Sequence, residues 1–96
     1  METQTKDNVS TIKINENFNF SCQAEFRQTY EKIPKSNRFI LDFSKTSYID
    51  SAALGMLLLL KEYAGGDGSK IEIIKCKPEV QNIFQISNFG QLFKIS

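Results

Sequence analysis

The sequence contains no histidine among its 96 residues. Imidazole is the usual general base and a common metal ligand near neutral pH, so its absence excludes Ser-His-Asp and Cys-His hydrolases and histidine-bearing zinc sites. Asp42, Asp50 and Ser51 do not form a catalytic set, because nothing supplies a base for the serine. The glycine-rich stretch at residues 65–68 lacks the Lys-Ser/Thr pair of a phosphate-binding loop. We therefore predict no catalytic residue, no metal, no cofactor and no enzymatic activity.

Cysteine, net charge and long apolar runs are also scarce. Cys22 and Cys76 form neither a C-x-x-C motif nor a disulfide scaffold. The formal net charge is +1, so no overall field attracts nucleic acid or an acidic membrane surface. The first seven residues lack the apolar core of a signal peptide. The longest apolar stretch, residues 52–60, is about half of the ~18–20 residues of a membrane span. We expect a reduced, soluble, cytoplasmic protein without direct nucleic-acid or membrane contact.

The residues that are present predict one α/β domain. Hydrophobic residues make up 41% of the chain, which is enough for a core, and the length suits one domain. We expect residues 1–8 to be a flexible segment and residues 9–96 to be the domain. The predicted order is a strand at 9–15, a second strand or hairpin arm near 18–20, a helix at 22–33, a strand at 38–43, a helix at 51–63, a strand at 70–76, a helix at 78–90 and a short strand at 92–95.

Three local features refine this assignment. Ser21 is a good cap for the first helix, and either Asp50 or Ser51 is a good cap for the second. The strand at 38–43 is almost continuously apolar, which predicts that both of its faces are covered. Pro78 suits the first turn of the last helix.

The helix at 51–63 is apolar on more than one side. At about 100° per residue, Ala53, Met56, Leu60 and Tyr63 face the sheet, whereas Leu54 and Leu58 fall on the side of Lys61, with Gly55 beside Glu62. One interpretation is a deeply buried helix, or exposed leucines without consequence. The other is an apolar patch for a protein partner. Gly55 favours the second interpretation. A glycine within a helix costs ~1 kcal/mol relative to alanine, and close approach of another chain or element would explain why it is there.

Ser51 is open to two interpretations. It is either only a helix cap, worth ~1 kcal/mol against alanine, or a phosphate acceptor. The free N–H groups and the positive end of the dipole at a helix start favour a phosphate. A phosphoryl group would place nearly two negative charges beside the apolar patch. The fold would tolerate this charge, whereas a partner interface would not.

Two segments carry a family resemblance. Phe-Ile-Leu-Asp-Phe-Ser at residues 39–44 and Tyr-Ile-Asp-Ser-Ala-Ala-Leu-Gly at residues 48–55 resemble the signature of STAS domains, and among these the bacterial anti-sigma factor antagonists. The resemblance covers nearly the whole chain. It implies a small α/β domain with a mixed sheet of about four to five strands and helices packed on one side. The sequence departs from the family at Ala52 and Ala53, where members often have Ser-Gly or Thr-Gly, and at Asn19, where they often have Asp.

The resemblance also implies a function. Ser51 corresponds to the serine that an anti-sigma factor, itself a serine protein kinase, phosphorylates. The unphosphorylated protein would bind that kinase and free the sigma factor, and a metal-dependent serine phosphatase would reset the phosphorylated form. The partner-binding residues expected from the patch and the resemblance together are Asp50, Ser51, Leu54, Gly55 and Leu58. The alternative is a constitutive STAS adaptor in a transporter or a larger signalling assembly.

Overall fold

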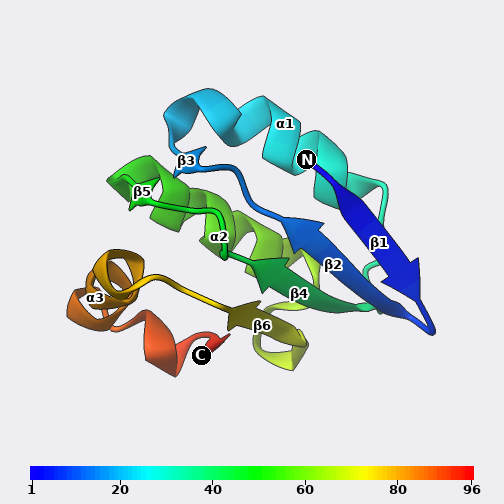
Figure 1. Cartoon of the computed structure of the whole chain (residues 1–96). Helices are drawn as coiled ribbons and strands as arrows, with labels where there is room; N and C mark the ends of the chain where they lie inside the picture. The colour runs from blue at the N-terminus through cyan, green and yellow to red at the C-terminus, as the bar shows by residue number, and fades with distance from the viewer.

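A computed structural model describes all 96 residues and shows a mixed five-stranded sheet with three helices (Figure 1). The sheet has the order β1-β2-β4-β6-β7, and only β1 runs antiparallel to its neighbour. The strands are β1 (Thr3–Lys6), β2 (Val9–Lys13), β4 (Arg38–Asp42), β6 (Ile71–Ile74) and β7 (Lys94–Ile95). A separate two-stranded sheet joins β3 (Asn17–Phe18) to β5 (Tyr48–Ile49). The predicted fold class is confirmed.

The helices are α1 (Gln23–Glu31), α2 (Ser51–Tyr63) and α3 (Pro78–Ile86), and three short 3-10 turns are η1 (Phe20–Cys22), η2 (Gly66–Gly68) and η3 (Phe89–Gln91). The predicted helix at 51–63 has the predicted ends, and the other predicted helices are shorter in the structure. None of the helices has the length and apolar character that crossing a bilayer requires.

The helices cover one face of the sheet and leave the other open (Figure 1). Phe39, Leu41 and Phe43 point into the helix layer and are fully buried, whereas Ile40, between them, is half-buried on the open face. The prediction that β4 is covered on both faces is therefore wrong. The apolar run does not indicate burial of both faces, because side chains alternate between the two faces of a strand. Arg38 and Asp42 lie on the open face together with Ile40.

A continuous chain of aromatic rings joins the helices to the sheet. Neighbouring ring centroids are 5.1–6.0 Å apart. In order, the rings are Tyr63, Tyr30, Phe26, Phe18, Phe43, Phe84, Phe89 and Phe93. Each such pair contributes about 0.5–1.5 kcal/mol beyond its buried area. The chain of rings therefore ties α2, α1, β3, the end of β4 at Phe43, α3 and η3 into one core.

The amino-terminal segment differs from the prediction. Residues 1–8 were expected to be flexible and outside the domain, but Thr3–Lys6 forms β1, paired with β2 along its length. The connecting turn holds Asp7 at φ 52° and Asn8 at φ 66°, a left-handed conformation that these short polar residues tolerate. All four β1 residues are exposed, so no apolar alternation marks the strand in the sequence.

The segment before α1 also requires a correction. Phe18 is buried in β3, which pairs in parallel with β5 and is not a hairpin arm, while Phe20 lies in η1 and is exposed. Ser21 does not cap α1. The Asn19 Oδ1 atom accepts a hydrogen bond from the Ser21 N–H at 3.0 Å, so Asn19 caps the turn that leads into the helix.

Candidate functional site

Asp50 caps α2 and also holds η1, the turn that leads into α1, against the start of α2. Its Oδ1 atom accepts a hydrogen bond from the Ala53 N–H at 2.9 Å, and its Oδ2 atom accepts one from the Phe20 N–H at 3.2 Å. The choice between Asp50 and Ser51 as cap is thus resolved in favour of Asp50. A carboxylate at this end of the helix is also favoured by the helix dipole. Asp50, expected in the partner-binding set, therefore has a clear structural role.

Ser51 is the first residue of α2, and its side chain is exposed. Its hydroxyl forms no hydrogen bond with another residue, because the capping position is already filled by Asp50. The hydroxyl is thus exposed to solvent, and an anionic group attached to it would lie at the positive end of the helix dipole. The fold neither needs the hydroxyl nor hinders its modification.

A line of exposed residues runs along α2 from Ser51. We call it the α2 stripe; it consists of Ser51, Gly55, Leu58, Leu59 and Glu62, all exposed. The spacing of four, seven, eight and eleven residues from Ser51 places them on one side of a helix. The two leucines are 41% and 53% exposed. The stripe therefore offers an apolar surface in line with a free serine hydroxyl.

The structure confirms part of the predicted patch and corrects the rest. Gly55 and Leu58 are exposed, as predicted, but Leu54 is half-buried and packs against the core. The buried side of α2 consists of Ala53, Met56, Leu57 and Leu60. The buried side thus includes Leu57, which was not expected there, whereas Tyr63 is half-buried and donates its hydroxyl proton to the Ile33 carbonyl at 2.8 Å. The helix is therefore rotated relative to the predicted orientation. This rotation exposes Leu59, which the sequence analysis missed.

The structure gives no reason of its own for a glycine at position 55. A Cβ atom built there would have no heavy atom within 4 Å. Glycine is also not required by the backbone, because the residue lies within α2 and has no positive φ. Alanine would stabilise the helix by ~1 kcal/mol. The missing side chain instead leaves room on the exposed side of α2, between Ser51 and the leucines.

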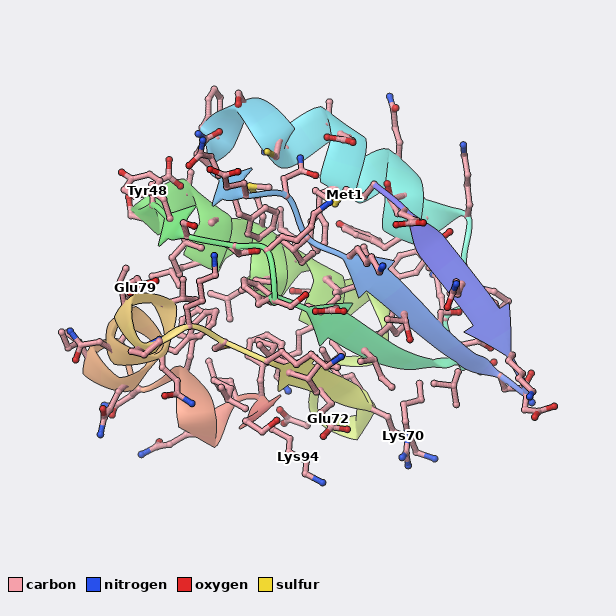
Figure 2. The ribbon with its side chains drawn as sticks, in the orientation of Figure 1. Met1, Tyr48, Lys70, Glu72, Glu79 and Lys94 are labelled. Atoms are coloured by element: carbon pink, nitrogen blue, oxygen red, sulfur yellow. The ribbon has the colours of Figure 1, made fainter.

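Two exposed aromatic side chains adjoin the start of α2. Phe20 is 67% exposed, and its N–H is bonded to Asp50. Tyr48 is 53% exposed and lies in β5, two residues before Asp50 (Figure 2). The sequence analysis did not identify either as a surface residue. No local signal distinguishes them from core aromatics, because their exposure depends on how β5 and η1 pack in the fold.

Asp42 lies at the end of β4 and is not poised for acid–base chemistry. Burial raises its pKa, but hydrogen bonds from Ser44 and the charges of Lys75 and Lys13 outweigh that effect and lower the pKa overall. The Ser44 N–H donates to the Asp42 Oδ1 atom at 2.8 Å. The carboxylate is therefore held ionised as part of a turn. No group of three or more cysteine, aspartate or glutamate side chains lies together where it could hold a metal ion.

Sequence comparison identifies a family for this chain. A family model described as "Mlab, STAS domain" matches residues 1–94. A STAS-domain containing protein of Pseudomonas aeruginosa is 47% identical over 87 residues, which cover 90% of this chain and 86% of the relative.

Three solved structures show the same fold at low sequence identity. A candidate anti-sigma factor antagonist from Thermotoga maritima has a TM-score of 0.86 and 18% identity, covering 98% of this chain and 83% of the other. The anti-sigma factor antagonist SpoIIAA in its unphosphorylated form has a TM-score of 0.80 and 15% identity, with 99% and 86% covered. A sulfate transporter family protein from Wolinella succinogenes has a TM-score of 0.76 and 17% identity, with 92% and 73% covered. The family model and the close relative together show that the chain belongs to the STAS-domain family.

Proposed function

We propose that the protein is an anti-sigma factor antagonist gated by phosphorylation. Unphosphorylated, it binds an anti-sigma factor that is also a serine protein kinase; phosphorylated on Ser51, it releases that partner. A metal-dependent serine phosphatase restores the binding form. The protein acts in the cytoplasm as a regulator of transcription and catalyses no reaction itself. The observation that carries the proposal is that the exposed hydroxyl of Ser51 forms no hydrogen bond with another residue and lies in line with the apolar residues of the α2 stripe.

Because of the position of Ser51, its phosphorylation should change the affinity for the partner more than it changes the stability of the fold. In the free protein, the helix dipole favours the added charge by ~0.3–1 kcal/mol. In the complex, the same charge must be desolvated against an apolar or acidic partner surface, at about a few kcal/mol unless it is paired. Each 1.4 kcal/mol is a tenfold change in affinity, so a loss of roughly a hundredfold is expected.

The proposed contact surface is the α2 stripe together with Phe20 and Tyr48. Leu58 and Leu59 supply the apolar contact, and Gly55 allows the partner backbone to approach the helix closely. Asp50 acts mainly by fixing the start of α2, and so the orientation of Ser51.

The phosphorylation step is tested with the cognate kinase and ATP. One phosphate should be added, and mass spectrometry should locate it on Ser51. The Ser51→Ala variant should remain unlabelled. Ser47→Ala is the matched control, because Ser47 is an exposed serine on the preceding loop, and it should be labelled like the wild type. Unchanged labelling of Ser51→Ala would refute the assignment of the acceptor.

The binding step is tested by calorimetric titration of the anti-sigma factor. Phosphorylated protein should bind roughly a hundredfold more weakly than unphosphorylated protein, and Ser51→Ala should bind like the latter even after treatment with the kinase. Leu58→Glu should weaken binding at least tenfold. Ile86→Glu, an equivalent change of an exposed apolar residue on α3, should leave binding unchanged. An equal effect of the two glutamate substitutions would contradict the proposed surface.

A constitutive adaptor in a transporter or a larger assembly is the second candidate. The likeness of the fold to a sulfate transporter family protein favours it. The same titration distinguishes the two, because an adaptor would show no difference in affinity for the anti-sigma factor with and without the phosphate on Ser51.

A further inference from the structure

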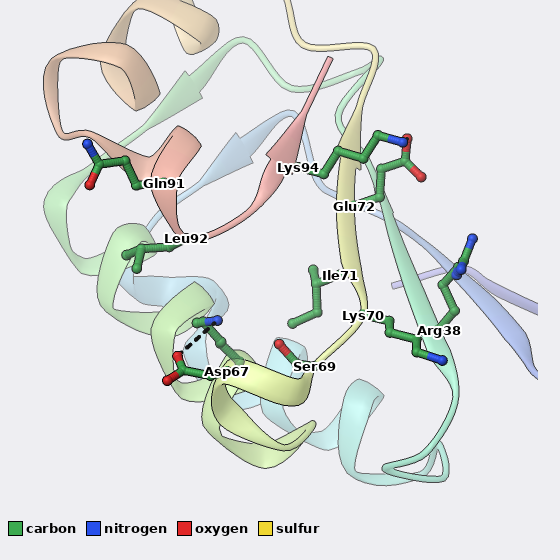
Figure 3. A pocket seen from close by; sticks show the side chains of 10 residues that line it. Arg38, Asp67, Ser69, Lys70, Ile71, Glu72, Gln91, Leu92 and Lys94 are labelled. Atoms are coloured by element: carbon green, nitrogen blue, oxygen red, sulfur yellow. Dashed lines mark ion pairs between the residues drawn. The ribbon is translucent and has the colours of Figure 1, made fainter.

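An open cavity lies at the opposite end of α2 from Ser51. It has a volume of about 440 Å³ and is formed by the end of α2, the η2 loop, the start of β6, and the η3–β7 segment (Figure 3). Its charged lining residues are Arg38, Lys61, Lys70, Lys94, Asp67 and Glu72. Because α2 has 13 residues, at 1.5 Å per residue the cavity is about 20 Å from the phosphorylation site. It is therefore independent of the function proposed above.

The cavity carries a surplus of positive charge. Its two carboxylates are each near one lysine: Lys61 Nζ is 4.0 Å from Asp67, and Lys94 Nζ is 4.0 Å from Glu72. Arg38 and Lys70 have no carboxylate partner within salt-bridge distance and remain in excess. The whole chain has a net charge of only +1, so this surplus is a local concentration of charge.

The two surplus cations are neighbours. Phe39 on β4 pairs with Ile71 on β6, and the Phe39 N–H donates a hydrogen bond to the Lys70 carbonyl. Arg38 and Lys70 each directly precede one of these paired residues, so they lie side by side. Figure 3 shows both side chains on the same side of the β6 segment. Like charges on adjacent strands are destabilising. An anion bound between them would relieve this repulsion.

The rest of the lining suits a small phosphate-bearing molecule. Arg38 begins β4, Lys70 directly precedes β6 and Lys94 begins β7, and these three strands are neighbours that lie about 4.8 Å apart. Two unpaired cations about one strand spacing, roughly 4.8 Å, apart match two linked phosphates better than one. Ser69 and Gln91 add neutral polar groups, and the 43% exposed Leu92 adds an apolar surface.

We propose that this cavity binds a small molecule that carries two or more linked phosphate groups. Arg38 provides a planar guanidinium that can donate two hydrogen bonds to one phosphate, while the ammonium group of Lys70 neutralises the next. A volume of a few hundred Å³ is typical of small-molecule sites. The ligand would contact β4, β6 and β7 and leave the α2 stripe free.

The test is an NMR titration of the ¹⁵N-labelled protein with sodium pyrophosphate at constant ionic strength. Saturable shifts are expected at the backbone amides of residues 69–72, Arg38 and Lys94, and orthophosphate should bind at least tenfold more weakly. The double variant Arg38→Gln/Lys70→Gln should weaken pyrophosphate binding at least tenfold. Lys32→Gln/Lys45→Gln removes the same charge from two exposed lysines outside the cavity and should have little effect.

Three results would overturn the proposal. These are shifts that do not saturate, equal weakening by the two double variants, and saturable shifts confined to the start of α2. Equal affinity for orthophosphate would overturn the assignment of linked phosphates. Circular dichroism of both double variants checks that each is folded. Because the readout does not involve Ser51 or the anti-sigma factor, failure here leaves the proposed function untouched, and the reverse also holds.

Discussion

Replacing Asp50 with alanine should destabilise the protein far more than replacing its neighbour Ser51. The Asp50 carboxylate accepts one hydrogen bond from the Ala53 N–H, which caps α2, and one from the Phe20 N–H, which is distant in sequence. A lost cap costs about 1 kcal/mol, and a lost bond to a charged acceptor costs about 1–2 kcal/mol at a partly exposed position. Asp50→Ala should therefore reduce the free energy of unfolding by about 2–3 kcal/mol.

Ser51→Ala should change the free energy of unfolding by less than about 0.5 kcal/mol, because the serine hydroxyl has no partner and alanine is the better helix former. The destabilisation by Asp50→Asn should lie between those of Ser51→Ala and Asp50→Ala. The amide oxygen of asparagine can accept the capping bond, but its amide nitrogen cannot accept the second bond. These differences are measured by urea unfolding. With a slope of about 1 kcal/mol per molar urea for a small domain, Asp50→Ala should lower the midpoint by about 2–3 M.

The order of these three free energies of unfolding tests whether Ser51 can be phosphorylated without loss of fold stability. If Ser51→Ala were as destabilising as Asp50→Ala, the serine hydroxyl would be part of the cap. Phosphorylation would then disturb the fold as well as the interface, and the reasoning from the two hydrogen bonds of Asp50 would be refuted. A wild-type midpoint for Asp50→Ala would refute it equally.

Three further predictions concern the core, the carboxylate and the thiol. Leu57→Ala should cost about 3–5 kcal/mol in urea unfolding because Leu57 is fully buried, whereas Leu59→Ala, at a 53% exposed position, should cost less than about 1 kcal/mol. Because the pKa of Asp42 lies below its ordinary value of 3.8, its ionised form stabilises the fold at neutral pH. The stability difference between wild type and Asp42→Asn should be constant from about pH 7 to 5 and shrink as the pH falls below about 4. Burial raises the pKa of Cys76 to about 11, so at pH 8 its thiol should react with a disulfide reagent roughly a hundredfold more slowly in the folded protein than in urea.

The sequence determined those features that depend on neighbours along the chain. The alternation around Ile12 and Ile14 and the apolar run at residues 38–43 located β2 and β4, because strand side chains repeat every two residues. The composition of residues 51–63 located α2, and its mixed apolar faces revealed that Leu58 is exposed. The Asp-Ser pair at its start placed a serine at a helix N-terminus. Each of these follows from local spacing and capping chemistry.

The tertiary structure decided what depends on pairing between distant segments. β1 is polar and exposed, so only its register with β2 identifies it as a strand. The cap of α2 was open between Asp50 and Ser51 until the contact with Phe20 and the bond to Ala53 assigned it to Asp50.

The rotation of α2 and the basic cavity also depend on tertiary structure. Leu57, and not Tyr63, completes the buried side of α2, which turns Leu59 outward. Arg38 and Lys70 are distant in the sequence and become neighbours only because β4 pairs with β6. Periodicity specifies which residues share a face of one element. It does not specify which elements meet or in which register, because that is decided by the packing of the whole core.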